Sequence, residues 1–142
     1  YFFPKFEARS TMAKTILQSS KVATPRGIMS QGVSVPAGRL VFVSGQVARD
    51  ANGQLVGKGD IKAQTRKTLE NVQAVLAESG ATMEDVVKVT VFVTDLGEQF
   101  AAIHEVRSEF FKSDYPASTL VEIKSLVDKE MLIEIEAVAV TH

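Results

Sequence analysis

The alternating pattern of residues 131–141 constrains the fold more than any other feature, because neither side of a strand built from them suits bulk water. Successive side chains of a strand point to opposite faces. One face is wholly aliphatic and consists of Ile133, Ile135, Ala137 and Ala139. The other mixes apolar residues with two glutamates and consists of Leu132, Glu134, Glu136, Val138 and Val140. A sheet containing this strand therefore needs cover on both faces.

Further strands are predicted at residues 40–46, 86–94 and 119–124. The second of these alternates strictly, with Val87, Val89, Val91 and Val93 on one face. Residues 33–35 and 40–46 flank a Pro-Ala-Gly-Arg turn, so we expect them to pair as a hairpin. Residues 40–46 end in Ser44, Gly45 and Gln46. A glycine at such a place indicates either a β-bulge or the close approach of a ligand or another backbone.

Two amphipathic helices are predicted. The first spans residues 60–80, with Asp60 as N-cap, Gly80 just after its end, and apolar residues at helical spacing. Those residues are Ile61, Leu69, Val72, Val75 and Leu76. The second starts at an Asp95 cap, with Glu98 as capping-box partner. Its expected buried arc consists of Phe100, Ile103, Arg107, Phe110 and Phe111, with His104 at the edge.

These elements predict an α+β domain whose aliphatic sheet face lies under the two helices. The opposite face would collect Phe42, Ser44, Phe92, Leu120, Glu122, Leu132, Glu134, Glu136 and Val138. Two helices cannot cover both faces, so symmetric self-association through this second face is the economical solution. Its carboxylates would then either form an ion-pair network, with Lys88 and Lys124 as partners, or line a pocket at the subunit boundary where one of them handles protons.

Composition excludes several function classes. The chain has 142 residues, 45% of them hydrophobic, which suits one soluble domain. A net charge of −1 gives no electrostatic basis for binding nucleic acid. The absence of cysteine excludes a thiol nucleophile, and two distant histidines argue against a zinc site, so we expect no metal and no cofactor. No apolar run reaches the roughly 18–20 residues of a membrane span. We expect a cytoplasmic protein.

Residues 1–11 do not resemble a signal peptide, and Met12 reads as a natural start. We interpret residues 1–11 as a cloning remnant and residues 12–142 as a single domain.

Several motifs together resemble the reactive intermediate deaminase (Rid, or YjgF) family. They are Val43-Ser44-Gly45-Gln46, Gly59-Asp60-Ile61-Lys62-Ala63-Gln64-Thr65, Leu69-Glu70-Asn71-Val72, residues 87–95, Tyr115-Pro116-Ala117 and Ile133-Glu134-Ile135-Glu136-Ala137. The resemblance implies a chorismate-mutase-like fold, in which a mixed sheet packs against two helices. It also implies a homotrimer with a central barrel and three small-molecule pockets at the subunit interfaces.

The resemblance also implies an activity. Known members hydrolyse enamines and imines such as aminoacrylate, with water adding at the imine carbon and ammonia leaving. In this sequence Glu134 matches the glutamate that positions or activates the water, and Ser44 and Gly45 match the pair that supports substrate and water. Glu134 is therefore the expected catalytic residue. A structural role at a subunit interface is the alternative.

The sequence departs from the family at four positions. Ser118 stands where the family has a carboxylate-binding arginine, and Leu120 stands at a cysteine position. His104 and Met29 stand at an asparagine and a pocket tyrosine. A serine brings neither charge nor bidentate geometry, so the prediction is a deaminase with altered or reduced activity. The alternatives are a non-catalytic small-molecule-binding or regulatory trimer and, with less support, an endoribonuclease or translation inhibitor.

Ser44, Gly45, Ser118, His104, Met29 and Arg107 are the expected substrate-binding residues. We hypothesise that Arg107 replaces the missing cation, either neutralising Glu134 or reaching a ligand carboxylate. The alternative is an arginine stem lying on apolar neighbours with its head in water. His104 could act as an acid or base near neutral pH or serve as a hydrogen-bonded structural residue.

Overall fold

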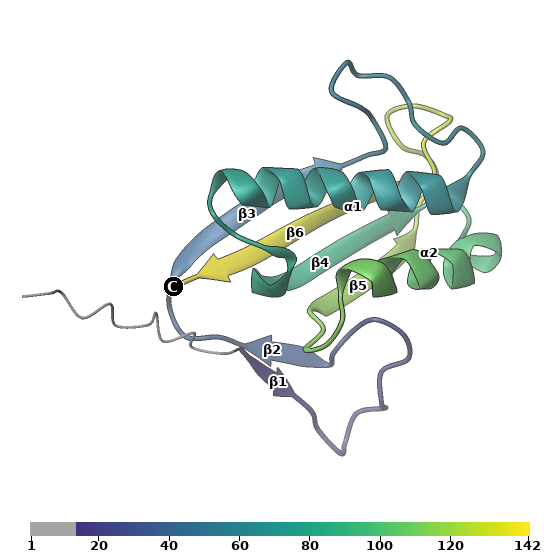
Figure 1. Cartoon of the computed structure of the whole chain (residues 1–142). Coiled ribbons are helices and arrows are strands. Elements are labelled where there is room, and N and C mark those ends of the chain that lie inside the picture. The colour runs from purple at the N-terminus through teal and green to yellow at the C-terminus, as the bar shows by residue number, and fades with distance from the viewer. Residues whose placement is uncertain (1–13) are drawn as a thin grey trace, which may run out of the picture.

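The computed structural model describes residues 14–142, so the interpretation of residues 1–11 lies outside the described part of the chain. Its elements, in chain order (Figure 1), are β1 (Thr15–Leu17), β2 (Gly32–Ser34), β3 (Arg39–Gln46), α1 (Ile61–Glu78), a short 3₁₀ turn η1 (Met83–Asp85), β4 (Val86–Val93), α2 (Leu96–Phe110), β5 (Ala117–Glu122) and β6 (Ile133–Thr141). The α+β prediction is confirmed.

The main sheet is mixed, with strand order β3-β6-β4-β5. β6 runs antiparallel to both β3 and β4, whereas β5 runs parallel to β4 after the α2 crossover. The predicted hairpin between residues 33–35 and 40–46 is wrong, because β2 pairs with β1 and β3 pairs with β6. A long apolar partner strand satisfies more of the β3 backbone than a three-residue strand can. The β1–β2 pair lies on the β5 side of the sheet (Figure 1), where a bridge joins Ser30 to Ala117.

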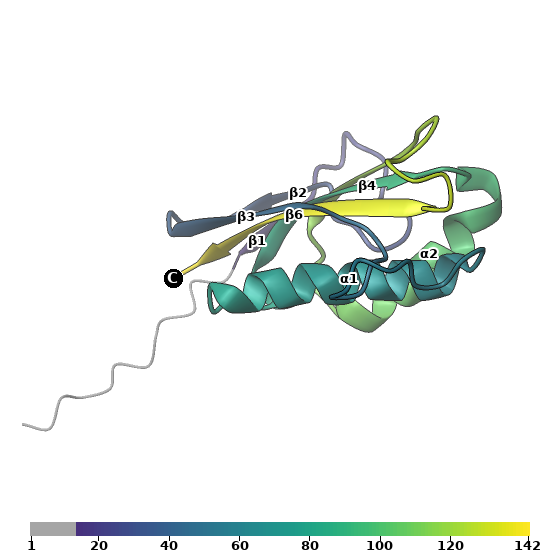
Figure 2. The ribbon, with the colours of Figure 1, turned by 90° about the horizontal axis from the view of Figure 1, so that it is seen from above.

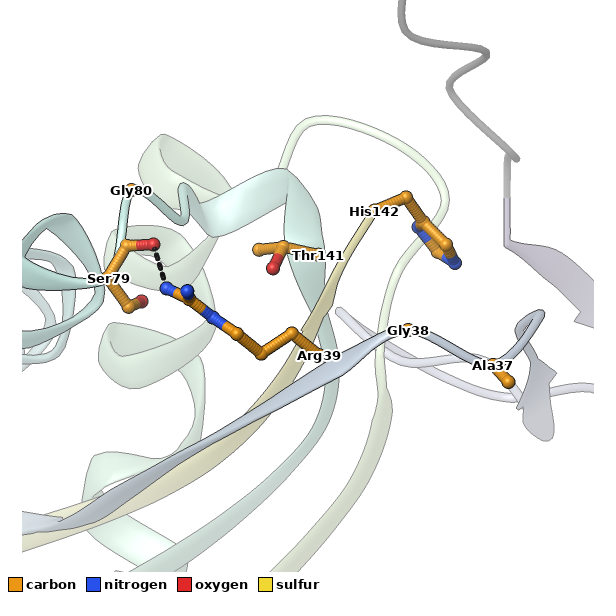
Figure 3. A pocket seen from close by; sticks show the side chains of 7 residues that line it. All are labelled: Ala37, Gly38, Arg39, Ser79, Gly80, Thr141 and His142. Carbon is orange, nitrogen blue, oxygen red and sulfur yellow. Dashed lines mark hydrogen bonds between the residues drawn. The ribbon is translucent and has the colours of Figure 1, made fainter.

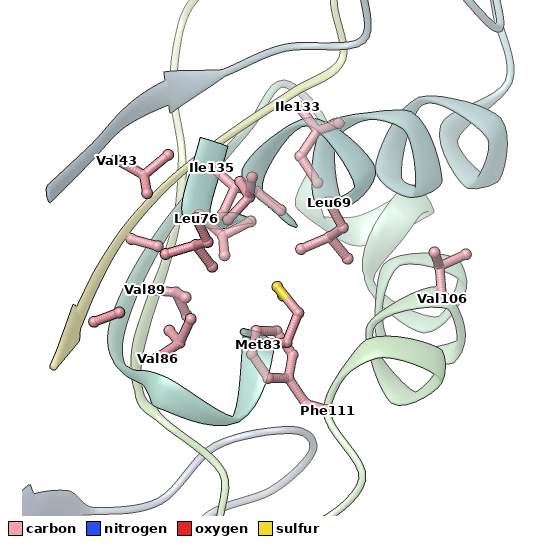
Figure 4. Packing of buried hydrophobic residues seen from close by; sticks show 14 of the residues in the cluster. Val43, Leu69, Leu76, Met83, Val86, Val89, Val106, Phe111, Ile133 and Ile135 are labelled. Atoms are coloured by element: carbon pink, nitrogen blue, oxygen red, sulfur yellow. The ribbon is translucent and has the colours of Figure 1, made fainter. Parts of the chain in front are cut away.

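Both helices pack against the same face of the sheet, as Figure 2 shows. The core between the layers is mostly aliphatic, with Phe111 and Met83 at one side (Figure 4). It includes Leu69 and Leu76 of α1, Ile103 and Val106 of α2, Val89 of β4, and Ile133 and Ile135 of β6. The predicted face of β6 is confirmed. In β4 a bulge between Val86 and Lys88 shifts the alternation, so Val86 lies in the core and Val87 is only half-buried.

Helix α1 has the predicted ends. Asp60 accepts a hydrogen bond from the Ala63 amide over 3.1 Å, and Gly80 follows the helix with φ +76°. Val75 was expected on the buried face and is exposed. Polar residues take part of that face instead, since Gln64, Thr65 and Thr68 are buried.

Helix α2 begins at the predicted Asp95 cap, which accepts a hydrogen bond from the Glu98 amide. The reciprocal contact comes from Gln99, whose Oε1 accepts from the Asp95 amide, and not from the Glu98 side chain. Phe100 is 42% exposed, so its place in the predicted buried arc is wrong. The arc is centred on Ile103 and Arg107, and Val106 completes it.

The second face of the sheet is covered by no helix of residues 14–142 (Figure 2) and carries large apolar side chains. Phe42 is 72% exposed and Leu40 58% exposed. Leu120 and Glu122 were predicted on this face, but the parallel register pairs them with Val91 and Val93, so they face the helices. Glu122 there accepts a hydrogen bond from the Leu96 amide at the start of α2, a position that favours negative charge.

Candidate functional site

Glu134 and Gly45 are in direct contact on the uncovered face. The pairing of β3 with β6 skips between Val43 and Gln46, which leaves Ser44 and Gly45 in a β-bulge. A Cβ atom at Gly45 would collide with Oε1 of Glu134 and would lie 2.9 Å from its Cδ. Both interpretations of Gly45 therefore meet here: it is a bulge residue, and it admits the close approach of a carboxylate.

Arg107 lies on the helix-covered side, and its guanidinium is buried at 1% exposure. Nη2 donates to the Ile28 carbonyl and to Oγ of Ser118, both over 3.0 Å. Nε is buried without a hydrogen-bond partner, and no carboxylate in residues 14–142 forms an ion pair with this arginine. Burial lowers the pKa of Arg107 to about 10, so the group still carries its proton at neutral pH. The interpretation of this arginine as a solvent-exposed head is wrong.

His104 lies one turn before Arg107 in α2 and packs against the loop that contains Gly27. Its ring is 4.1 Å from that of Phe100, and its Nδ1 is 3.0 Å from the Phe100 carbonyl oxygen. A side chain at Gly27 would overlap the imidazole, and Gly27 has φ +89°. Burial lowers the pKa of His104, and the nearby Arg107 charge lowers it further. Neutral imidazole is therefore favoured near pH 7.

Met29 and Ser30 connect this loop to the start of β5. The Ser30 amide donates to the Pro116 carbonyl over 3.2 Å, next to Ala117 and Ser118. Met29 is half-buried, and the buried hydroxyl of Ser30 has no hydrogen-bond partner among residues 14–142.

The predicted site residues thus form two groups in one chain. The glutamate group consists of Ser44, Gly45 and Glu134, and the arginine group consists of Met29, His104, Arg107 and Ser118. Ser118 pairs with Val89 and Glu134 pairs with Phe92, so the two side chains point to opposite faces of the sheet. They are also about 10 Å apart along the strand direction. One chain by itself does not bring the two groups together.

Among residues 14–142, the charges of the uncovered face form no ion pairs with one another. The ion pairs found in residues 14–142 join Lys58 to Glu130, Lys62 to Glu105 and Arg66 to Glu109. Lys88, a predicted partner of the carboxylates on this face, instead donates to the Thr119 hydroxyl over 2.8 Å. The glutamates of this face therefore have no ion-pair partner in the described part of the chain.

A family model described as endoribonuclease L-PSP matches residues 20–141. A RutC family protein of Pyrococcus abyssi is 44% identical over 128 residues, covering 90% of this chain and 98% of that protein. A crystal structure of YyfB, a conserved Rid family protein of Yersinia pestis, matches with a TM-score of 0.84 at 34% identity, covering 92% of this chain and 100% of that one. The chain belongs to the Rid (YjgF) family.

A third relative is TdcF of Escherichia coli, whose name describes it provisionally as a reactive intermediate deaminase. It is 37% identical over 131 residues, covering 89% of this chain and 97% of that protein. Its crystal structure with bound serine matches this Rid protein with a TM-score of 0.66 at 34% identity, covering 90% of this chain and 99% of that one.

Three further features were considered in the described part of this Rid protein: a metal site, a membrane span and a surface hollow. Residues 14–142 contain no group of three or more acidic or histidine side chains that could hold a metal ion. No helix in the same range combines the length and the apolar character needed to cross a membrane. A surface hollow lies where β3 begins, at the opposite end of this strand from Gly45 (Figure 3). It is lined by Ala37, Gly38, Arg39, Ser79, Gly80, Thr141 and His142. It contains none of the predicted site residues, and Arg39 closes part of it by donating to the Ser79 carbonyl.

Three residues that lie near the arginine group, Gly27, Ile28 and Ser30, were not predicted from the sequence as part of a site. The backbone carbonyl of Ile28 accepts a hydrogen bond from Arg107, and Gly27, which has no side chain, leaves room for the ring of His104. The buried hydroxyl of Ser30 has no hydrogen-bond partner among residues 14–142. None of these roles depends on a reactive side-chain type or on a periodic pattern. The one available signal was the Pro-Arg-Gly turn at residues 25–27, which indicates a turn but not what packs on it.

Proposed function

We propose that this Rid protein hydrolyses small enamines or imines in a cleft formed by two chains of a homotrimer. The observation that carries the proposal is the Glu134 carboxylate, held against the bulged Gly45 on a sheet face that no helix in residues 14–142 covers. A second chain seated on that face would bury Phe42 and Leu40 and would bring its own groups toward Glu134.

The chemistry needs few protein groups. Water adds to the imine carbon while Glu134 accepts one water proton and the imine nitrogen gains a proton, which gives a tetrahedral amino alcohol. The amino group then takes up a proton, the C–N bond breaks as the hydroxyl loses its proton, and ammonia and a carbonyl product are released. An enamine first gains a proton at carbon to become the imine. Ser44 lies beside Gly45 in the bulge with an exposed side chain, where its hydroxyl could help to hold the water.

The family relationship supports the same proposal. TdcF carries a deaminase description, and its crystal structure contains serine, a small amino acid. The departure at Ser118 leads us to expect lower or altered activity on substrates that depend on an arginine in that position.

The direct test is ammonia release from freshly generated aminoacrylate or iminopropionate. We expect the purified protein to accelerate it and E134Q to lose at least about a hundredfold of that rate. E136Q is the matched control, because Glu136 lies two residues along the same face of β6 and should retain activity. Equal rates in E134Q and wild type would contradict the proposed role of Glu134.

A non-catalytic binding protein is the second candidate, because the family arginine is replaced by Ser118. No ammonia release from any tested imine, together with saturable binding of a small ligand, would favour it. Endoribonuclease activity has the family model's description behind it. The net charge of −1 gives it no electrostatic support, and cleavage of a single-stranded RNA by wild type but not E134Q would favour it over deamination.

A further inference from the structure

Two amide side chains of α1 bind backbone groups of the irregular segments that lead to Glu134 and away from Gly45. Gln64 and Asn71 are seven residues apart in the helix. This spacing is close to two helical turns, so both side chains project from the same side of α1. The helix itself packs on β3 and β6, the strands that carry Gly45 and Glu134 (Figure 1). The chemical steps of the proposed reaction use neither amide.

Gln64 holds the segment that enters β6. Its side chain is completely buried, and its Oε1 accepts a hydrogen bond from the Leu132 amide over 2.8 Å. Its Nε2 donates to the carbonyls of Glu130 and Gly57 over 2.9 and 3.1 Å. Glu134 follows two residues after Leu132. The buried amide therefore fixes the place where the chain enters β6, because these backbone groups would otherwise be buried without partners.

Asn71 holds the segment that leaves β3. Its Nδ2 donates to the carbonyls of Val47 and Arg49, both over 2.9 Å. Val47 is two residues beyond Gly45, and pairing with β6 resumes at Gln46 after the bulge. The bulge is thus held on one side by strand pairing and on the other by an amide from α1.

We infer that Gln64 and Asn71 are positioning residues, which set the Glu134 carboxylate against Gly45 by holding the two segments next to them. The inference rests on the proposed function in taking Glu134 as the group that activates water. The two amides act from the helix-covered side on a contact that is made on the uncovered face. The effect on rate is large, since a displacement of about 1 Å at a reacting group can cost about a hundredfold.

The hydrogen-bonding capacity of an amide suits this task better than that of other side chains. Gln64 donates twice and accepts once, which matches two carbonyls and one backbone amide. Glutamate would place a carboxylate against both carbonyl oxygens. Methionine keeps the length of glutamine but makes none of these bonds, and leucine stands in the same relation to Asn71. Q64M and N71L are therefore the informative variants.

The first test is steady-state ammonia release from freshly generated iminopropionate. We expect Q64M and N71L each to lower kcat at least about tenfold while KM changes by less than about threefold, because only water activation is disturbed. T68V is the polar control, since it removes a buried hydroxyl of α1 that has no hydrogen-bond partner in residues 14–142. V72A is the stability control and removes core volume from the same helix. Both controls should retain kcat at a temperature where every variant is folded.

The second test reads the contact without any reaction. In nuclear magnetic resonance spectra of the isotopically labelled full chain, the Gly45 amide signal should shift as a carboxylate titrates between about pH 7 and pH 4. E134Q should abolish this response. Q64M and N71L should each reduce its amplitude at least about twofold, and T68V and V72A should leave it unchanged.

A wild-type kcat or a wild-type Gly45 response in both Q64M and N71L would overturn the inference. Equal losses in V72A would overturn it too, because general loosening of the helix would then suffice. Should Q64M not fold, N71L decides, since Asn71 is only half-buried. If no tested imine releases ammonia, the proposed function fails and the Gly45 response alone decides the positioning role. Ammonia release that neither variant changes would keep the deaminase and refute the positioning role.

Discussion

The carboxylate of Glu134 occupies the space where a side chain at position 45 would begin. The strand pairing makes this contact possible, since the bulge at Ser44 and Gly45 turns the glycine toward β6. A glutamate on a free sheet face would otherwise sample several rotamers in water. The contact with a flat patch of backbone limits the positions that it can take, and the consequences can be measured.

Replacing Gly45 by alanine should impair activity more than stability. The new Cβ would displace Oε1 of Glu134, which lies at the movable end of its side chain, so we expect the free energy of unfolding to change by less than about 1 kcal/mol. Ammonia release should fall at least about tenfold, because the carboxylate moves from its position. G97A is the control, since the nearest atom to its Cβ would be 3.9 Å away. A large loss of stability with full activity would refute this account.

Placing a charge on the uncovered face should dissociate the proposed trimer. F42D puts a carboxylate where Phe42 is 72% exposed in the single chain, and burying it between chains would be strongly unfavourable. Light scattering after size exclusion should show a trimer for wild type and a monomer for F42D at micromolar concentration. V75D, on the exposed side of α1, should remain trimeric. A trimer that survives F42D would mean that association uses another surface.

Restoring an arginine at position 118 should be harmful unless Arg107 is also removed. S118R directs a second cation toward a guanidinium that already contacts this position, and like charges at such a distance repel. We expect S118R to lower the free energy of unfolding by roughly 1–3 kcal/mol and R107Q/S118R to regain much of it. Chemical denaturation of the four proteins in this cycle measures the coupling. Additive effects would show that the two side chains do not interact.

His104 should make the protein less stable as the solution becomes acidic. Burial lowers its pKa in the folded state below the ordinary 6.5, so the unfolded chain takes up the proton first as the pH falls. Stability from this group is therefore complete above about pH 6.5 and declines below it. H104N should flatten the fall in unfolding free energy between about pH 7 and pH 5. H142N serves as control, and an unchanged slope in H104N would contradict the assignment.

Helix boundaries were predicted correctly where a single residue type determines where a helix begins or ends. Asp60, Asp95 and Gly80 mark helix boundaries through hydrogen bonds or backbone freedom that involve only nearby residues, and each occupies the expected place. The aliphatic face of β6 was readable for the same reason. Phe100 and Val75 were misplaced because periodicity gives the centre of a buried arc but not its width.

Register and strand order were beyond the reach of the sequence. The sheet face on which Leu120 and Glu122 lie depends on the parallel pairing of β5 with β4. The pairing partner of residues 33–35 depends on which strand pairs with β3, and here that strand is β6. Register and strand order are both set by pairing between segments that are distant in the sequence and have similar patterns. A register shift of one residue would move every side chain of a strand to the other face of the sheet.

By itself the sequence determined the α+β architecture and the two helices, because periodicity, capping and side-chain type are written locally. It also supplied the residues that we propose for the site. Only the tertiary structure decided that Arg107 bonds to Ser118 on one side of the sheet while Glu134 rests on Gly45 on the other. The reason is physical: side-chain neighbours across a fold follow from strand register and helix docking, which minimise the free energy of the whole packed chain and not of any one segment.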